Sequence, residues 1–124
     1  MTQHADTFFI ESARRTIALE GAAISALSSA LDQSFAEACR HIMSTTGRVV
    51  VTGIGKSGHI AGKIAATLAS TGSPAFFVHP AEASHGDMGM VTRDDCVIAL
   101  SNSGSTSEVC LLYTSDAADD SGCV

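Results

Sequence analysis

The sequence has no tryptophan, one tyrosine and two prolines among its 124 residues. With so few large aromatic rings, the composition lacks the stacking platforms that bind single-stranded nucleic acids. Basic residues are also scarce: seven Lys and Arg stand against 13 Asp and Glu, the formal net charge is −6, and no basic cluster occurs. This balance argues against nucleic acids and anionic membrane surfaces as partners.

Secretion signals and long apolar runs are absent as well. The first residues, MTQHADTFFIESARR, lack the basic start and apolar run of a signal peptide. No segment reaches the roughly 18–20 apolar residues of a membrane helix. The four cysteines, at positions 39, 96, 110 and 123, show no CxxC spacing. We therefore expect a cytoplasmic protein with reduced thiols, with Cys96 buried in an apolar run.

What the chain does contain is enough apolar sequence, 45%, for one small domain. Residues 6–30 are predicted to form a helix, because apolar residues recur every seven positions. These are Ile10, Ile17, Ile24 and Leu31. A second helix is predicted over residues 32–46, with Asp32 as its N-cap and Gly47 closing it.

From residue 48 onward the pattern changes to strands alternating with helices. The apolar runs at 48–54, 75–79 and 96–101 predict three strands, and residues 59–70 predict a helix that ends at Gly72. This alternation indicates βαβ units and a parallel sheet. If the second strand lies outside the first, the strand order is 2-1-3, as in flavodoxin-like, doubly wound α/β folds.

Two polar loops follow the first and third predicted strands. The first is TGIGKSGH, and the second is SNSGSTSE at 101–108. In the order 2-1-3 both loops lie at the carboxyl edge of the sheet, where ligands bind. Glycines, hydroxyls and the first amides of a helix suit a phosphate group. The structural alternative for the second loop is a solvated, serine-rich helix cap.

The glycine turn itself allows three interpretations. A P-loop requires a glycine where Val50 stands, so that motif fails. GIGKSG matches GxGxxG, but a dinucleotide fold calls for an acid after the next strand, where the chain has His79 and Pro80. The third interpretation, a sugar-phosphate site that includes Ser57, is favoured, and no cofactor is expected.

The segment HPAEASHGDMG at 79–89 is rich in possible metal ligands, namely His79, Glu82, His85 and Asp87. Histidine and carboxylate suit zinc, but this spacing matches no standard ligand pattern. A polar loop with an Asp-capped turn is the favoured interpretation, and no metal is predicted.

Read in order, these motifs resemble a known family. GKSGH, FFVHP, SHGDMGM and SNSG are similar to the sugar isomerase (SIS) domain of bacterial D-arabinose 5-phosphate isomerases. The resemblance extends from the two N-terminal helices to Val109. It implies interconversion of ribulose 5-phosphate and arabinose 5-phosphate, the first step towards the lipopolysaccharide sugar Kdo. It also implies a cytoplasmic Gram-negative enzyme that is a homotetramer.

The resemblance also implies roles for individual residues. Lys56 and Glu108 match the catalytic lysine and glutamate of the family, a base and a charge-stabilising group being what aldose–ketose isomerisation needs. The implied substrate-binding residues are Gly55, Ser57, His85, Ser101, Asn102, Ser103 and Thr106. The structural alternatives are a first-turn carboxylate for Glu108 and a solvated loop charge for Lys56.

The last 15 residues, CLLYTSDAADDSGCV, depart from the family pattern. We expect residues 1–109 to be the N-terminal part of a truncated SIS domain, and 110–124 to be a non-native read-through tail. Further strands, a second glutamate, a histidine and, in many members, CBS domains would follow in the family. On this hypothesis residues 1–124 alone are inactive. Two alternatives stay open: a SIS regulator that only binds sugar phosphate, and a phosphohexulose isomerase.

Overall fold

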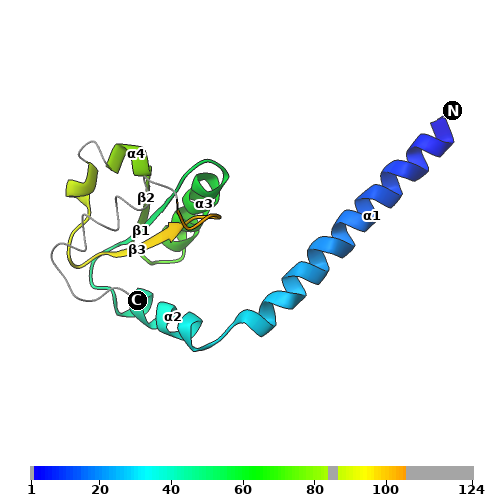
Figure 1. Ribbon diagram of the computed structural model, residues 1–124. Coiled ribbons are helices and arrows are strands. Elements are labelled where there is room, and N and C mark those ends of the chain that lie inside the picture. The colour runs from blue at the N-terminus through cyan, green and yellow to red at the C-terminus, as the bar shows by residue number, and fades with distance from the viewer. Residues whose placement is uncertain (1, 84–86, 106–124) are drawn as a thin grey trace. The chain divides into compact units, whose positions relative to one another are not determined.

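The computed structural model describes residues 2–83 and 87–105 (Figure 1). The chain divides into two compact units, residues 1–40 and residues 41–124. Within the described residues, no helix combines the length and the apolar character needed to cross a membrane.

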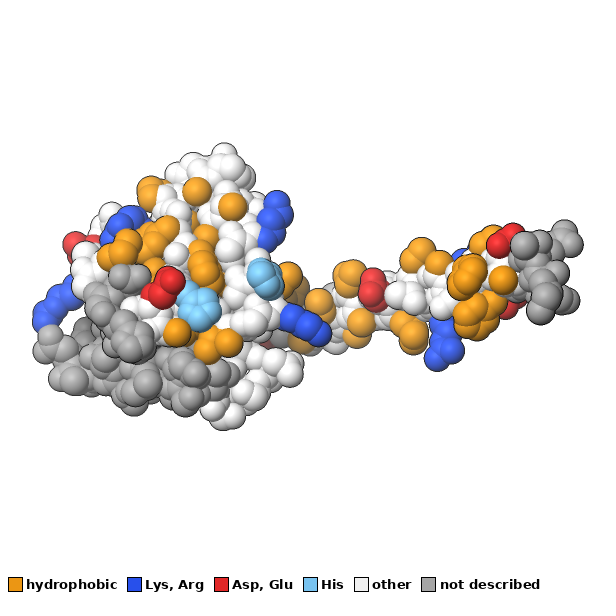
Figure 2. Space-filling view, turned by 90° about the horizontal axis from the view of Figure 1, so that it is seen from above, with side chains coloured by type: hydrophobic (Ala, Val, Ile, Leu, Met, Phe, Trp, Pro, Cys, Tyr) orange, Lys and Arg blue, Asp and Glu red, His pale blue; other side chains and the backbone are white. Residues whose placement is uncertain are grey.

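The first unit is dominated by one long helix. Helix α1 spans Thr2–Leu27 and continues into the short 3-10 helix η1, Ser28–Ala30. It begins four residues before the predicted start, and the hydroxyls of Ser28 and Ser29 bond back to carbonyls three residues earlier, consistent with the tightened last turn. Figure 2 shows hydrophobic side chains along the visible face of this helix. The exposed large ones are Phe8, Phe9, Ile10, Ile17, Leu19, Ile24 and Leu27.

Helix α2 spans Gln33–Ser44. Asp32 caps it as predicted, since its carboxylate accepts hydrogen bonds from the N–H and the hydroxyl of Ser34. These bonds, the hydroxyl of Ser34 first, lower the pKa of Asp32. The helix ends at Ser44, so the prediction that Gly47 closes it is wrong. A Cβ at Gly47 would lie 2.6 Å from the carbonyl oxygen of Asp94, so this glycine is needed for a close approach of two backbones.

The second unit is built on a parallel three-stranded sheet. Its strands are β1 (Val49–Gly53), β2 (Ala75–Val78) and β3 (Cys96–Leu100), in the order β2-β1-β3. Both the predicted order and the α/β fold are confirmed. Where a strand begins or ends at another residue than predicted, the difference is one residue.

Strand β1 is the centre of the core, because all five of its residues are buried. On one face Val49 and Val51 pack with Ala61 and Ala65 of helix α3 (Lys56–Ser70). On the other face Val50 and Val78 pack together, with Phe76 and Val91 against them. In β3, burial alternates along the strand, and Cys96 is half-buried rather than buried as predicted. The reason is that β3 lies at the edge of the sheet within the described residues.

Helix α3 spans Lys56–Ser70 and connects β1 to β2. Its C-terminus is the predicted one: Gly72 has φ 99° and donates to Ala69, while the N–H of Ser73 donates to the carbonyl of Leu68. These two bonds form a Schellman motif. Its N-terminus lies three residues earlier than predicted, which places Lys56 on the first turn of the helix. The short helices α4 (Pro80–Ala83) and η2 (Asp87–Met90) lie between β2 and β3.

Candidate functional site

The strand register brings the two predicted binding loops together. Gly53, the last residue of β1, pairs with Leu100, the last residue of β3. The glycine turn and the serine loop therefore leave the sheet side by side, at its carboxyl edge. A Cβ at Gly53 would lie 3.1 Å from the carbonyl oxygen of Leu100, so a side chain at this point would press against the start of the serine loop.

The glycine turn depends on two glycines for different reasons. Gly55 has φ 59° and ψ −126°, a backbone conformation that side chains strongly disfavour, and nothing lies within 4 Å of the Cβ position. Gly58 is needed for space, because a Cβ there would lie 2.6 Å from the carbonyl oxygen of Gly53. Together they allow a strand to turn directly into a helix.

The turn presents Lys56 and Ser57 as the first two residues of α3. The side chain of Lys56 is exposed and that of Ser57 is half-buried. The first hydrogen bonds of the helix are donated by the N–H groups of Gly58 and His59, to the carbonyls of Ile54 and Gly55. A helix N-terminus that carries a lysine is electrostatically suited to a phosphate.

The serine loop is a compact turn on the neighbouring strand. The N–H of Gly104, a residue with φ 67°, donates to the hydroxyl oxygen of Ser101 at 2.9 Å. The N–H of Ser105 donates to the hydroxyl oxygen of Ser103 at 3.3 Å. Asn102 and Ser103 are exposed. The structure thus brings six of the predicted site residues to one edge: Gly55, Lys56, Ser57, Ser101, Asn102 and Ser103.

The other three predicted site residues, His85, Thr106 and Glu108, lie outside the described residues. Near His85 the structure describes the start of its segment: the half-buried His79 accepts a hydrogen bond on Nδ1 from the N–H of Ala81, at 3.2 Å. Among the described residues no three His, Cys, Asp or Glu side chains gather as metal ligands would.

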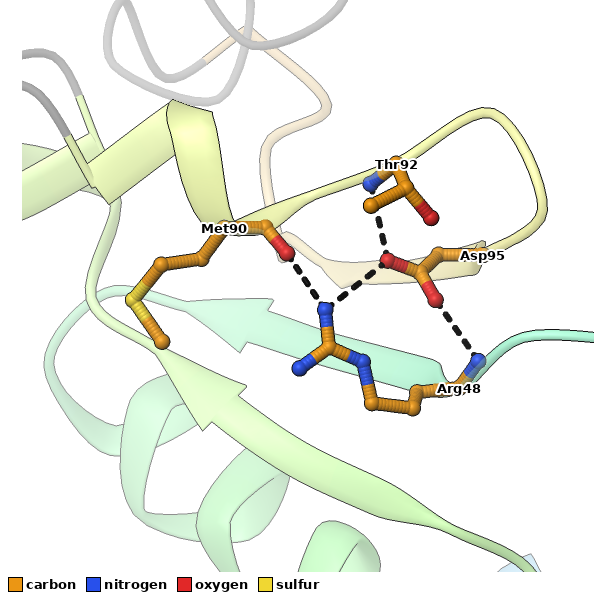
Figure 3. A network of polar contacts seen from close by, with 4 residues as sticks. All are labelled: Arg48, Met90, Thr92 and Asp95. Atoms are coloured by element: carbon orange, nitrogen blue, oxygen red, sulfur yellow. Dashed lines mark hydrogen bonds and ion pairs between the residues drawn. The ribbon is translucent and has the colours of Figure 1, made fainter.

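The opposite, amino edge of the sheet holds a polar network that sequence reasoning missed (Figure 3). Asp95, whose side chain is only 1% exposed, accepts hydrogen bonds from the N–H groups of Thr92 and Arg48, at 2.8 and 2.6 Å, and from the guanidinium of Arg48 at 3.3 Å. The N–H of Thr92, followed by the donors of Arg48, lowers the pKa of Asp95 to about 2 against the opposing effect of burial. The signal that could have indicated this network is a pair of opposite charges, Arg48 and Asp95, each directly before one of two adjacent strands.

Comparison with known families identifies the domain. The SIS domain family model matches residues 42–120, more than half of the chain. The chain belongs to the SIS domain family. This agrees with the order β2-β1-β3 and with the glycine and serine loops at one edge of the SIS sheet.

Several curated relatives of this SIS domain carry the same name. The arabinose 5-phosphate isomerase KdsD of Pseudomonas aeruginosa is 61% identical over 112 residues, which is 90% of this chain and 34% of that protein. KdsD of Escherichia coli K12 is 51% identical over 104 residues, 84% of this chain and 32% of that protein. The chain thus spans about a third of the length of these relatives.

A solved structure supports the same fold. An Escherichia coli CFT073 protein, determined in complex with A5P, aligns with a TM-score of 0.85 and 42% sequence identity. The alignment covers 95% of this chain and 61% of that one.

Proposed function

We propose that the complete protein interconverts D-ribulose 5-phosphate and D-arabinose 5-phosphate in the cytoplasm, on the route to Kdo. The observation that carries the proposal is the pairing of Gly53 with Leu100, which sets the glycine turn beside the serine loop. The high identity to proteins named arabinose 5-phosphate isomerase, and the similar structure bound to A5P, support the choice of sugar.

In this proposal the two loops bind the substrate. The helix N-terminus with Ser57, together with Ser101, Ser103 and Thr106, would hold the phosphate or the sugar hydroxyls. Gly55 allows the backbone to approach the ligand, and Asn102 and His85 would line the site.

The chemistry requires a proton to move between neighbouring carbons. Glu108 would remove the proton from C1 of ribulose 5-phosphate and return it to C2, through an enediol. Lys56, exposed at the carboxyl edge of the sheet, would stabilise the negative charge that develops on the oxygens. The role of Glu108 is assigned from the resemblance, and that of Lys56 from the resemblance and from the position of its turn.

Incubation of the complete gene product with ribulose 5-phosphate tests the proposal. Arabinose 5-phosphate should form, and Glu108→Gln should abolish its formation while leaving the fold intact by circular dichroism. If no pentulose phosphate is turned over, the protein is not this isomerase. Conversion of a hexulose phosphate in its place would make it a phosphohexulose isomerase.

We further propose that the protein is a homo-oligomer, a tetramer, with α1 as a contact surface. Its apolar side chains are largely exposed, with Ile17 at 71% and Ile24 at 68%. Such a surface is expected to pack against a partner subunit. Replacing both isoleucines by aspartate should yield smaller species on a sizing column, and an unchanged elution volume would contradict this.

A further inference from the structure

The polar network at the amino edge reaches beyond the two strands that it joins. The guanidinium of Arg48 donates to the carboxylate of Asp95 and also to the carbonyl oxygen of Met90, at 2.5 Å, as Figure 3 shows. It lies 4.6 Å from the centre of the Phe76 ring. One side chain thus connects the start of β1, the start of β3, a residue of β2 and the end of η2.

Met90 ends η2, which lies in the segment 79–95 that connects β2 to β3 and in which the sequence places His85. The beginning of that segment is also held by β1. The hydroxyl of Thr52 donates to the carbonyl of Val78 at 2.6 Å in the buried core, and Pro80 is fully buried. The segment therefore leaves the sheet beside Thr52 and returns to it beside Arg48.

We propose that Arg48 and Asp95 are positioning residues, which set the placement of the Asp87–Met90 helix and thereby the affinity of the carboxyl-edge site for sugar phosphate. The effect on affinity rests on the proposed function. The effect on Asp87–Met90 does not, because it follows from the bond to Met90 alone.

The hydrogen bonds distinguish the positioning of Asp87–Met90 by the Arg48 side chain from a role in joining strands alone. Asp95 already connects the start of β3 to the start of β1 through the N–H of Arg48, without the guanidinium, and its bond from the N–H of Thr92 is local. The Arg48 side chain is 41% exposed, so it is not needed to fill a cavity. What arginine adds is a planar, multidonor group that can contact a carboxylate and a carbonyl together. Lysine at this position would keep the charge and lose that geometry.

The test compares Arg48→Lys with Arg40→Lys in the complete protein. Arg40 is a matched control because its side chain is 60% exposed and pairs only loosely with Glu37, at 3.7 Å. The exchange rates of the backbone amides of residues 87–91 should rise about tenfold in Arg48→Lys, whereas those of Val49–Gly53 should change by less than about twofold. In assays well below the melting temperature, the KM of Arg48→Lys for ribulose 5-phosphate should rise about tenfold, and its kcat should stay within about threefold of that of the unmodified protein. Arg40→Lys should change neither.

A purely structural role for Arg48 would lower the melting temperature and leave KM unchanged in the folded variant. Unchanged KM, or unchanged exchange at 87–91, therefore overturns the inference. If Arg48→Lys does not fold, Arg48→Gln replaces it in the same measurements. If the unmodified protein has no turnover, the proposed function fails, and exchange at 87–91 then decides the positioning of Asp87–Met90 alone: a tenfold rise supports it and no rise overturns it.

Discussion

At the carboxyl edge of the sheet, polar groups are presented to solvent, whereas at the amino edge they bond to one another. Lys56, Asn102 and Ser103 are exposed at the first edge. At the second, the carboxylate of Asp95 is 1% exposed and accepts hydrogen bonds from the N–H groups of Arg48 and Thr92 and from the guanidinium of Arg48. A buried polar group needs partners within the fold, whereas an exposed polar group stays accessible to a ligand.

The largest effect should come from removing the exposed cation of the carboxyl edge. Lys56→Met should lower kcat for ribulose 5-phosphate by about a hundredfold or more, because the charge on the developing enediolate loses its stabilising partner. The matched control is Lys63→Met, an exposed lysine two turns along the same helix. Both variants should melt at similar temperatures, since neither side chain is buried. Equal turnover of the two would mean that Lys56 is a solvated loop charge.

Removing the buried carboxylate of the amino edge should lower stability. Asp95→Asn should lower the free energy of unfolding by about 3 kcal/mol at neutral pH, because it leaves the donors around this carboxylate poorly paired. Asp94→Asn, a change of an exposed neighbour, should have almost no effect in the same denaturant titration.

The pH dependence of stability gives a second measure of Asp95. Its pKa is about 2 in the folded protein and 3.8 as a free side chain. A carboxyl with a depressed pKa stabilises the fold fully above its unfolded pKa, and this contribution is lost as pH falls through the folded pKa. The urea concentration at the unfolding midpoint should thus decrease as the pH is lowered from about 4 to about 2. This decrease should be smaller in Asp95→Asn. Parallel slopes in the two proteins would show that Asp95 does not carry this dependence.

Two glycines of the same region should respond to alanine with opposite signs. Gly55→Ala should destabilise the fold by about 1–3 kcal/mol, because an L-residue is strained at φ 59° and ψ −126°. Gly62→Ala, inside α3 with nothing within 4 Å of the new Cβ, should stabilise it by about 0.5–1 kcal/mol. Urea midpoints measure both, and shifts of the same sign would contradict the requirement for glycine at position 55.

The smallest effect is expected in the serine loop. Ser101→Ala removes the acceptor for the N–H of Gly104, a loss of about 1 kcal/mol that should raise KM about fivefold. Ser70→Ala is the control, because that hydroxyl bonds the carbonyl of Thr67 at the exposed end of α3. A KM equal in the two variants would argue that the loop does not bind the substrate.

Much of the fold could be predicted because periodicity and turn residues report on it directly. The continuous β-branched run of β1 predicted a strand buried on both faces, and all five of its residues are buried. Gly72 predicted the end of α3 because only glycine commonly adopts its positive φ at a helix C-terminus. Gly47 misled the prediction, since a glycine can also serve a close contact between segments distant in sequence.

The site was predicted as two loops, and the register of β1 with β3 brings those loops together. The Arg48–Asp95 pair was not predicted, because its members are 47 residues apart and meet only through that register. Local pattern reports which residues can turn or cap, whereas a contact between two strand ends depends on the pairing of the strands.

The most direct test is ligand-dependent hydrogen exchange in the complete protein, with arabinose 5-phosphate and with unphosphorylated arabinose. Only the phosphorylated sugar should protect residues 53–58 and 101–105, with no change in the backbone amides of Arg48 and Asp95 at the amino edge. Equal protection by both sugars, or no protection at the carboxyl edge, would mean that these two loops do not form one sugar-phosphate site.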